Sequence, residues 1–372
     1  MKHIVCFHLF NDYSGSPKVL KMVLEGLLKQ GYEIDLVSSK GGVLDELLTY
    51  PNLHKHSYPY HFSNNPVITM LRYTAVQLYT FLLAFRWLFC KDTVFYINTL
   101  LPAGPALAGR LMGKRVVYHY HENAFVKGGF YKLLAGFMQK LAHEIICVSA
   151  YQASFLKRKK GVKVIPNALP KQFTDRLVYN PDAAFERKRV LMLGSLKLYK
   201  GSLEFISLAQ QLPQFAFELV VNDTQENIDL FITEHKITIC KNLTIYPRQN
   251  DVTPFYNRAS MVLNLSNKNI IIETFGLTAL EAMSAGLPVI VPTEGGIAEM
   301  VEDGVNGYKI DVQELDKIEK RIYSILSDRD TYIKVSMAAY KYSQTYNESA
   351  MIEKLSSVIN NNSPLKFFQV LS

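Results

Sequence analysis

The feature that most constrains the fold of this chain is a regular alternation of short apolar runs with longer stretches in which apolar residues recur at helical spacing. The runs at 4–9 and 33–38 have the length and composition of buried strands, and the stretch 17–30 between them predicts a helix that ends at Gly31. Similar strands are expected at 94–97, 115–119, 144–148 and 162–165. Strands that alternate with helices predict a parallel, doubly wound α/β sheet.

The same alternation starts again in the second half of the chain. The stretch 170–189 has no sustained apolar period and is expected to be a linker, after which strands are predicted at 190–193, 218–221, 243–246, 261–265 and 288–291. A length of 372 residues also exceeds what one hydrophobic core usually supports. We therefore expect two α/β domains, at 1–169 and 190–345, with a cleft between the carboxyl ends of their sheets, where open α/β folds bind ligands.

The charge balance indicates an acidic partner. The formal net charge of +8 favours nucleic acid, anionic lipid or a phosphorylated substrate. Aromatic runs that bind RNA, zinc fingers and basic heptad regions are missing from the sequence, so no nucleic-acid partner is expected. The stretch 68–90 is the most membrane-like, but Arg72 and Arg86 interrupt it, and it predicts one or two amphipathic helices. With the basic run 157–160, these helices raise the hypothesis that the chain docks on an anionic membrane surface.

The cysteines bear on the cellular compartment. Cys6, Cys90, Cys147 and Cys240 lie far apart and form no CxxC pair, a pattern typical of buried thiols in a reducing cytosol rather than of a zinc or dithiol site. The sequence begins with a strand-like run instead of the basic and apolar segments of a signal peptide. A cytoplasmic location is therefore expected, and a peripheral place at the inner face of the plasma membrane would follow from the membrane hypothesis.

The segment 263–290 carries the strongest chemical signal. Glu273 is predicted to lie in the loop after a strand, and Glu281 lies one to two turns inside a helix that Gly286 and Pro288 terminate. Amides at 275–278 and the positive end of the helix dipole can receive a diphosphate, and the two carboxylates can accept hydrogen bonds from sugar hydroxyls. This arrangement predicts a site for a polyhydroxylated anion.

This segment resembles the donor-binding region of glycosyltransferase family 4, in which a Glu, seven residues and a second Glu precede Ala-Met, Gly-x-Pro-Val-Ile and Gly-Gly. The matching residues are Glu273, Phe275, Gly276, Glu281, Ala282, Met283, Gly286, Pro288, Val289, Ile290, Gly295, Gly296, Glu299, Gly304, Asn306 and Gly307. The resemblance implies the GT-B architecture, with two facing Rossmann-like doubly wound domains and a cleft between them. In that architecture a C-terminal segment, 346–372 here, packs back toward the N-terminal domain.

The resemblance also implies roles for residues of this segment. Glu281 would hold the ribose hydroxyls of a nucleoside-diphosphate sugar, and Glu273 would hold hydroxyls of the transferred sugar. The backbone of Gly276 and Leu277 would lie near the phosphates, with the amides of the surrounding 275–278 turn, which includes Phe275 and Thr278. No metal or other cofactor is expected beside the sugar donor.

A second candidate site follows the predicted strand 190–193. Gly194 and Ser195 begin a turn that contains Lys197 and Lys200, and cations in this turn can neutralise a departing diphosphate. The family usually has Gly-Arg at the first two positions, so Ser195 is a departure, whereas Lys200 matches the Lys-Gly that follows. The substitute for the missing arginine is Lys197 or Arg248, and the sequence leaves both open.

The N-terminal half offers further candidates. Gly15 and Ser16 lie in the loop after the first strand, with Ser16 as the expected N-cap, and this loop resembles the family's glycine loop near the donor phosphate and the acceptor. His119 and His121 share one face at a strand end, but no third ligand has metal-site spacing, so no zinc is expected. The family's strand-end histidine is matched by His121, with His119 as the alternative, which implies that His121 lies beside the transferred sugar.

An Asp-x-Asp triplet at Asp328 and Asp330 is a pattern that binds metal and nucleotide sugar in the other main glycosyltransferase fold. In this sequence the triplet falls within a predicted helical region, between Leu326 and Tyr332, and outside any strand-end loop. It is therefore expected to cap a helix, and no metal site is predicted.

The predicted function is that of a retaining glycosyltransferase. It would move a hexose-type sugar from a nucleoside-diphosphate sugar to a hydroxyl of a saccharide or lipid-linked acceptor, in bacterial surface polysaccharide or glycolipid assembly by family analogy. His121, Lys200 and Glu273 are the catalytic candidates. The alternatives are a GT-B sugar-nucleotide epimerase and a catalytically weakened donor-binding partner protein, which the departure at Ser195 would fit.

Overall fold

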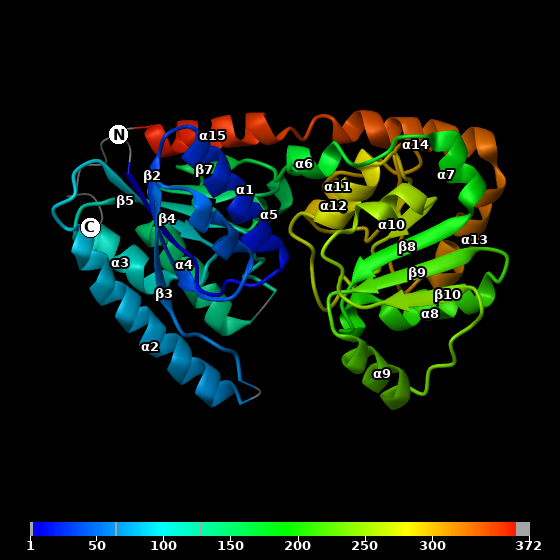
Figure 1. The fold of residues 1–372 in the computed structure, drawn as a ribbon, viewed down its shortest axis with the longest axis horizontal. Coiled ribbons are helices and arrows are strands. Elements are labelled where there is room, and N and C mark those ends of the chain that lie inside the picture. Colours follow the sequence, from blue (N-terminus) through cyan, green and yellow to red (C-terminus); the bar gives the residue numbers. More distant parts are fainter. Residues whose placement is uncertain (1–2, 64, 127, 362–372) are drawn as a thin grey trace. The chain divides into compact units, whose positions relative to one another are not determined.

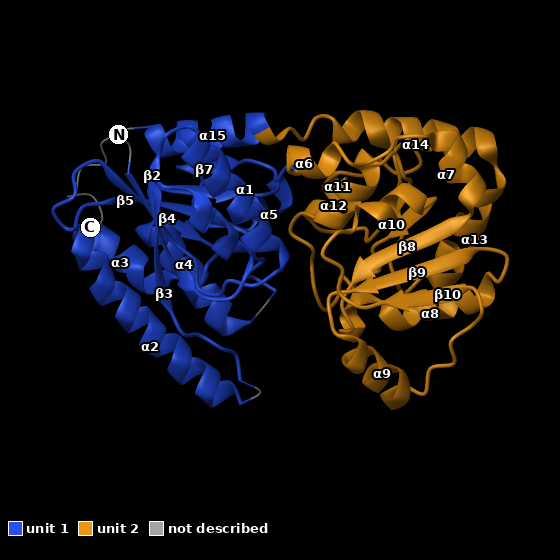
Figure 2. Cartoon of the chain, in the orientation of Figure 1, with its two compact units in different colours: residues 1–168, 349–372 blue, residues 169–348 orange. Residues whose placement is uncertain are grey.

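The computed structural model describes residues 3–63, 65–126 and 128–361, and the chain divides into two compact units. Residues 1–168 and 349–372 form the first unit, and residues 169–348 form the second (Figure 2). The stretch 170–189, expected as a linker, contains α6 (Lys171–Thr174) and α7 (Pro181–Arg187) and belongs to the second unit. Its attachment comes from Phe185, which is buried against the ring of Tyr332 at a centroid distance of 5.3 Å. A seven-residue helix is too short to show an apolar period in the sequence.

The first unit is built on a seven-stranded sheet with the order β3-β2-β1-β4-β5-β6-β7 (Figure 1). Its strands are β1 (His3–Phe7), β2 (Glu33–Ser39), β3 (Leu53–Tyr58), β4 (Thr93–Asn98), β5 (Arg115–Tyr120), β6 (Glu144–Cys147) and β7 (Val162–Val164). Its helices are α1 (Gly15–Lys29), α2 (Pro66–Ala84), α3 (Ala103–Leu111), α4 (Gly129–Leu141) and α5 (Ala150–Ser154), with 3-10 turns η1 (Val43–Thr49) and η2 (Phe85–Trp87). Every pairing is parallel, as the sequence predicted.

The second unit contains a six-stranded parallel sheet with the order β10-β9-β8-β11-β12-β13 (Figure 1). Its strands are β8 (Arg189–Gly194), β9 (Ala216–Val221), β10 (Leu243–Tyr246), β11 (Met261–Leu263), β12 (Val289–Val291) and β13 (Tyr308–Lys309). Besides α6 and α7 it has η3 (Leu198–Lys200), α8 (Ser202–Gln211), α9 (Gln225–Glu234), α10 (Thr253–Arg258), α11 (Leu277–Ser284), α12 (Gly296–Glu299), α13 (Leu315–Ser327) and α14 (Arg329–Ser343). The chain then enters α15 (Glu348–Asn360).

Two strands lie outside the predicted set, and both are at the edge of a sheet. The sequence of β3 is Leu-His-Lys-His-Ser-Tyr, which is mostly polar, and β13 has two residues. Each forms because it pairs with a neighbouring strand, β3 with β2 and β13 with β12. An edge strand has one exposed side, so it needs no apolar run of its own.

The core of the first unit is aromatic around Trp87, the only tryptophan in the sequence. Its ring meets the edges of Phe7 and Phe95 at centroid distances of 6.2 and 6.5 Å, and all three side chains are buried. The indole N–H donates to the Asp35 carboxylate at 2.7 Å. Burial raises the pKa of Asp35, but hydrogen bonds from His3, His56 and Trp87 outweigh this effect and lower it to about 2. The carboxylate is therefore charged at neutral pH and anchors the tryptophan.

Helix α1 begins two residues earlier than predicted. Ser14, not Ser16, is its N-cap, and Pro17 is the third helical residue. The backbone N–H and the hydroxyl of Ser14 both donate to Asp12 Oδ1, at 3.0 and 2.6 Å, which turns the chain into the helix. Proline is tolerated at the third position because the first four amides of a helix have no partner within it.

Helix α15 packs on the first unit. A Cβ added to Gly26 of α1 would lie 2.2 Å from Ile352 Cδ1, so only glycine lets the two helices approach this closely. Tyr32 bonds Ser356 Oγ at 2.7 Å, and the Arg115 guanidinium donates to the carbonyls of residues 358 and 359 at 2.6 Å each. Arg115 thereby satisfies carbonyls that the end of a helix leaves without partners.

The stretch 68–90 contains a single long helix, α2, followed by η2. The prediction of amphipathic helices was wrong, because apolar side chains occupy the exposed face of α2 as well as the buried one. Within the described ranges, the segment Pro66–Trp87 is the one helix with the length and composition needed to cross a membrane, and 22% of its apolar 18-residue window is buried.

The expectation of four buried thiols holds for two of them. Cys6 and Cys147 are buried in the sheet of the first unit, Cys240 is half-buried, and Cys90 is exposed, three residues after the end of η2. All four are free cysteines. The apolar residues before Cys90 face solvent themselves, which is why the apolar run was a misleading sign of burial.

Candidate functional site

The candidate residues of the second unit gather where its strand order reverses. Strands β8 and β11 are neighbours in the sheet, although β9 and β10 come between them in the chain. The loops after these strands touch, because the Asn267 amide donates to the Tyr199 carbonyl at 2.8 Å. Gly201 has φ +80°, and a Cβ on it would lie 2.3 Å from Leu265 Cβ. Such a reversal is the usual ligand position in an open α/β sheet.

Lys200 and Glu273, predicted separately from two motifs, meet at this point. Lys200 Nζ forms an ion pair with Glu273 Oε1, and Ser266 Oγ donates to the same oxygen at 2.9 Å. The two charged side chains are 25% and 21% exposed, so both remain accessible to a ligand. Ser266 was not predicted, although it lies in the same loop.

Three glycines shape the loop around Glu273. The Glu273 carbonyl accepts from the Gly296 amide at 2.8 Å, and a Cβ on Gly295, at φ +108°, would lie 2.5 Å from that carbonyl oxygen. Gly276, at φ +92°, is the N-cap of α11, and its Cβ would meet the side chain of Ile297 at 2.4 Å. Glycine is therefore required at positions 276 and 295 for the backbone of this loop to lie against α12.

The N-terminus of α11 presents its first amides without a side-chain cap. These are the amides of Gly276, Leu277 and Thr278, which have no acceptor within a helix. Phe275 is 4% exposed and packs edge-on against Tyr346 at 5.8 Å, so this residue can offer a ligand only its backbone. An uncapped helix N-terminus attracts an anion.

Glu281, on the second turn of α11, accepts a hydrogen bond from the Tyr256 hydroxyl. Tyr256 lies on α10 and is fully buried. Burial and the adjacent Glu281 raise the pKa of Tyr256 well above its ordinary value, so its phenol is protonated and donates. The tyrosine orients the carboxylate. No pattern in the sequence links these two residues, which are 25 positions apart.

The turn after β8 carries the remaining cations. Lys197 is exposed, with Nζ 5.9 Å from the centre of the Tyr199 ring. The Ser195 carbonyl accepts from Ser202 Oγ at 2.8 Å, which closes the turn onto α8. Arg248 follows β10, and its Nε donates to Asn222 Oδ1 at 2.7 Å.

Asn222 connects Arg248 to this turn, because the Asn222 amide donates to the Gly194 carbonyl at 3.0 Å. Both candidates for the missing arginine thus adjoin the turn, Lys197 as part of it and Arg248 through Asn222.

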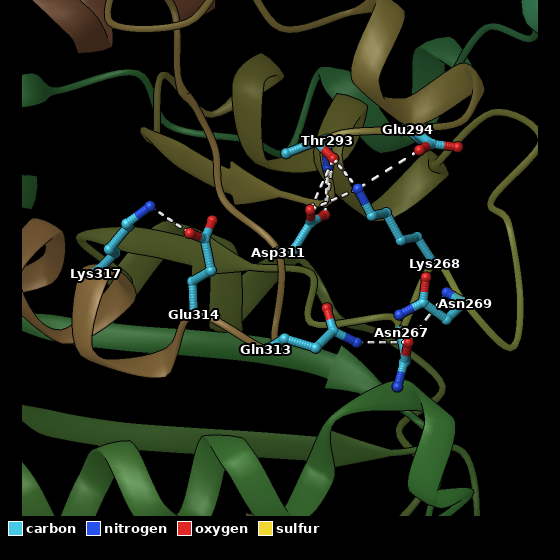
Figure 3. Close-up of polar contacts among 9 residues, drawn as sticks. All are labelled: Asn267, Lys268, Asn269, Thr293, Glu294, Asp311, Gln313, Glu314 and Lys317. Carbon is cyan, nitrogen blue, oxygen red and sulfur yellow. Dashed lines mark hydrogen bonds and ion pairs between the residues drawn. The ribbon is translucent and has the colours of Figure 1, made fainter.

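A polar cluster that was not predicted fixes the loop after β11 (Figure 3). Lys268 Nζ pairs with Asp311 Oδ2 at 2.7 Å and with Glu294 at 3.5 Å, and it donates to Thr293 Oγ1 at 2.7 Å. Gln313 donates to Asn267 Oδ1 at 2.7 Å in the same view. Thr293 follows β12 and Asp311 follows β13, so the cluster ties the loop that carries Glu273 to two further strand ends.

The candidates of the first unit also lie at the carboxyl ends of central strands. Gly15 and Ser16 follow β1 and form the first turn of α1. His121 follows β5, and its Nε2 bonds Asn98 Oδ1 at 3.0 Å, while Asn98 Nδ2 bonds His8 Nδ1 at 3.1 Å. Asn98 was not predicted, yet it joins the ends of β1, β4 and β5.

His119 of β5 and His121, which follows β5, differ in their surroundings. His119 is fully buried and bonds the Tyr96 hydroxyl through Nδ1 at 2.7 Å, whereas His121 is half-buried, and their rings are 4.1 Å apart. Burial, with smaller contributions from His119 and His8, lowers the pKa of His121 well below its ordinary value. His121 is therefore neutral at pH 7 and can act on a ligand only through hydrogen bonds.

The described residues contain no group of three or more His, Cys, Asp and Glu side chains arranged to hold a metal ion. Asp328 caps α14 by accepting from the Thr331 amide at 3.2 Å and from its hydroxyl at 2.6 Å, as expected for the Asp-x-Asp triplet.

Solved structures of other proteins share this fold. The fold resembles the crystal structure of HepE from Anabaena in complex with UDP and glucose, with a TM-score of 0.76 and 18% identity over 96% of this chain and 99% of that one. It also resembles WaaG, a glycosyltransferase involved in lipopolysaccharide biosynthesis, with a TM-score of 0.69 and 16% identity over 97% and 100% of the two chains. The two parallel-sheet units therefore have the fold of the GT-B class.

The sequence comparison identifies the family. Residues 13–172 match the family described as Glycosyltransferase Family 4, and residues 180–342 match Glycosyl transferases group 1. The chain therefore belongs to the glycosyltransferases of group 1 and family 4. A curated relative, the poly(glycerol-phosphate) alpha-glucosyltransferase of Bacillus subtilis (strain 168), is 23% identical over 249 residues. That match covers 65% of this chain and 36% of the relative, so the chain spans about a third of the relative's length.

Proposed function

We propose that this chain transfers a hexose from a UDP-sugar of the glucose type to an acceptor hydroxyl, with retention of anomeric configuration. The observation that carries the proposal is the Lys200–Glu273 ion pair beside the uncapped N-terminus of α11, at the point where the sheet order reverses. The relatives support the donor. HepE is known in complex with UDP-glucose, and the Bacillus relative is named an alpha-glucosyltransferase.

In the proposed mechanism each group has one task. The diphosphate binds the first amides of α11. Glu281 accepts hydrogen bonds from the ribose hydroxyls, and Glu273 accepts hydrogen bonds from hydroxyls of the hexose. Lys200 stabilises the negative charge that develops on the diphosphate as the bond to the sugar breaks, and this diphosphate takes the proton of the acceptor hydroxyl. Arg248 supplies the planar cation of the family's arginine, which Ser195 replaces in this chain. His121 binds the hexose as a neutral hydrogen-bonding group.

The acceptor and the location are further parts of the proposal. A saccharide or lipid-linked acceptor of a bacterial surface polymer would suit a relative of a poly(glycerol-phosphate) glucosyltransferase and of WaaG. Free cysteines suit a cytoplasmic location, where nucleotide sugars are used.

The donor is tested by thermal unfolding with UDP-, GDP-, ADP- and TDP-sugars. A ligand at 100 times its Kd stabilises by about 2.7 kcal/mol, so one UDP-hexose should raise the Tm and Glu281→Ala should abolish the rise. Release of UDP that depends on acceptor, with the product anomer assigned by NMR, establishes the reaction. Donor consumption without acceptor would indicate an epimerase, and binding without turnover would indicate a weakened partner protein.

Tyr256→Phe is expected to raise the KM for the donor about 5- to 10-fold and to change kcat less than 2-fold. The variant keeps the shape of the ring and removes the hydrogen bond that orients Glu281, a loss of about 1 kcal/mol in donor binding. Steady-state kinetics at saturating acceptor measure it. The matched control is Tyr323→Phe, an exposed tyrosine on α13 that should leave both constants unchanged. An unchanged KM in Tyr256→Phe would remove Glu281 from the donor site.

A further inference from the structure

One face of α2 is an exposed apolar stripe. Its residues recur at intervals of three, four or seven, which places them on a single side of the helix and of η2 that continues it. They are Val67, Leu71, Leu78, Leu82, Phe85 and Phe89, with exposures of 66, 66, 60, 60, 38 and 91%. Apolar side chains this exposed on a continuous face require a partner, because a monomer rarely presents such a surface to water.

The opposite face of α2 is already occupied by the fold. Val76, Thr80 and Ala84 are buried. The Tyr73 hydroxyl donates to the Leu101 carbonyl at 2.8 Å, and the Gly104 amide donates to Gln77 Oε1 at 2.9 Å. The stripe is therefore held outward.

The neighbouring helices extend the surface. Helix α2 packs on α3, and α3 packs on α4 (Figure 1). Leu107 and Leu111 of α3 are 42 and 62% exposed, and Leu133 and Phe137 of α4 are 58 and 46% exposed. Each pair is spaced by four residues and so lies on one side of its helix. We call the stripe and these two pairs the α2–α4 surface.

Charge is distributed unevenly around this surface. Between residues 47 and 143 the sequence has ten basic and two acidic residues, an excess of eight that equals the formal net charge of the whole chain. Arg86, Lys91, Lys132 and Lys140 of this region are exposed and take part in no ion pair among the described residues. Cations beside exposed apolar side chains are the combination that binds anionic lipid headgroups together with the acyl boundary.

The topology decides between lying on a membrane and crossing it. Helix α2 connects β3 to β4, which run parallel in one sheet. The connecting chain must therefore run back from the end of β3 to the start of β4, alongside the sheet. A membrane span would pull these strands apart and expose the buried face of α2.

Within the basic run 157–160, Arg158 is held by the fold, whereas the three lysines are exposed. The Arg158 guanidinium donates to the carbonyls of Gln139, Ala142 and His143 at 3.0, 2.6 and 2.7 Å.

We propose that the α2–α4 surface docks the protein on an anionic lipid bilayer, with α2 lying in the plane of the interface and its apolar stripe inserted. The inference does not depend on the identity of the sugar donor, because every residue that carries it belongs to the first unit and none is a donor-site candidate.

The test is flotation of the full chain with phosphatidylglycerol vesicles at low salt. The wild type is expected to float, and Leu71→Glu combined with Leu82→Glu should lower binding at least 10-fold, because carboxylates would face the headgroups. The control is Leu48→Glu with Val164→Glu, which adds the same charge at exposed residues of η1 and β7 and should bind like the wild type. Trp87 fluorescence confirms that both variants are folded.

Exposed Cys90 provides a second measurement. A polarity-sensitive dye on Cys90, in a Cys240→Ser background, should shift to shorter wavelength with phosphatidylglycerol vesicles and far less with phosphatidylcholine vesicles. The proposal would be overturned if the wild type did not float, or if the Leu71 and Leu82 variant floated as well as the wild type. Equal binding to neutral and to phosphatidylglycerol vesicles would also overturn it. If the wild type formed a soluble dimer and bound no vesicles, and if the Leu71 and Leu82 substitutions dissociated that dimer, the surface would be assigned to self-association instead.

Discussion

Lys200→Met is expected to lower kcat about 10³-fold while changing the donor KM by less than 10-fold. The lysine supplies the positive charge nearest to Glu273 and thus to the predicted position of the departing diphosphate. Removing one preorganised group that stabilises transition-state charge costs up to about 4 kcal/mol, which corresponds to this fall in rate. Initial rates at saturating donor and acceptor measure the effect. Lys334→Met, an exposed lysine on α14, is the control and should be as active as the wild type.

A double-mutant cycle separates the role in catalysis from the role in the ion pair. Glu273→Gln alone is expected to lower kcat about 10²-fold. Because Lys200 and Glu273 are in contact, the double variant should lose less than the product of the two single effects. A kcat for Lys200→Met within 10-fold of the wild type would show that another cation, Lys197 or Arg248, carries the charge stabilisation.

Acidification from pH 5.5 to 4.5 is expected to destabilise the first unit by about 5 kcal/mol. Burial lowers the pKa of His8 and of His143 to about 4, that of His119 to about 3, and that of His121 well below its ordinary value. Unfolded histidine titrates near 6.5, so in this window the unfolded chain binds roughly 3.5 more protons than the folded unit. Each such proton lowers the free energy of unfolding by about 1.4 kcal/mol per pH unit, and stability therefore falls as the pH falls.

Trp87 makes this prediction measurable for the first unit alone, because the only tryptophan of the sequence lies in its core. Urea unfolding followed by its fluorescence should show the slope. His119→Gln, which keeps a polar partner for the Tyr96 hydroxyl, should reduce the slope by about 1.4 kcal/mol per pH unit. His61→Gln, at an exposed histidine, should leave it unchanged. A wild-type slope below about 1 kcal/mol per pH unit would contradict neutral, buried histidines.

Local sequence pattern was sufficient to predict the class of fold and to locate the candidate site residues of the second unit. The apolar runs of the sequence located eleven strands of the two sheets within a few residues, because most of these strands are buried on both faces and must be locally apolar. Its glycines marked real constraints, since Gly276 and Gly295 occupy positions where a Cβ would strike Ile297 and the Glu273 carbonyl. Local pattern is sufficient for features that depend on a few consecutive residues.

Which distant residues meet depends on the tertiary fold. Strand order, set by the crossovers, brings Lys200 to Glu273, Tyr256 to Glu281, and Lys268 to Asp311. It also decided that α2 has apolar side chains on its exposed face, whereas the sequence predicted amphipathic helices in this stretch. Periodicity records how polar each side of an element is, whereas a contact between two elements depends on their places in the sheet, and no local pattern encodes those places.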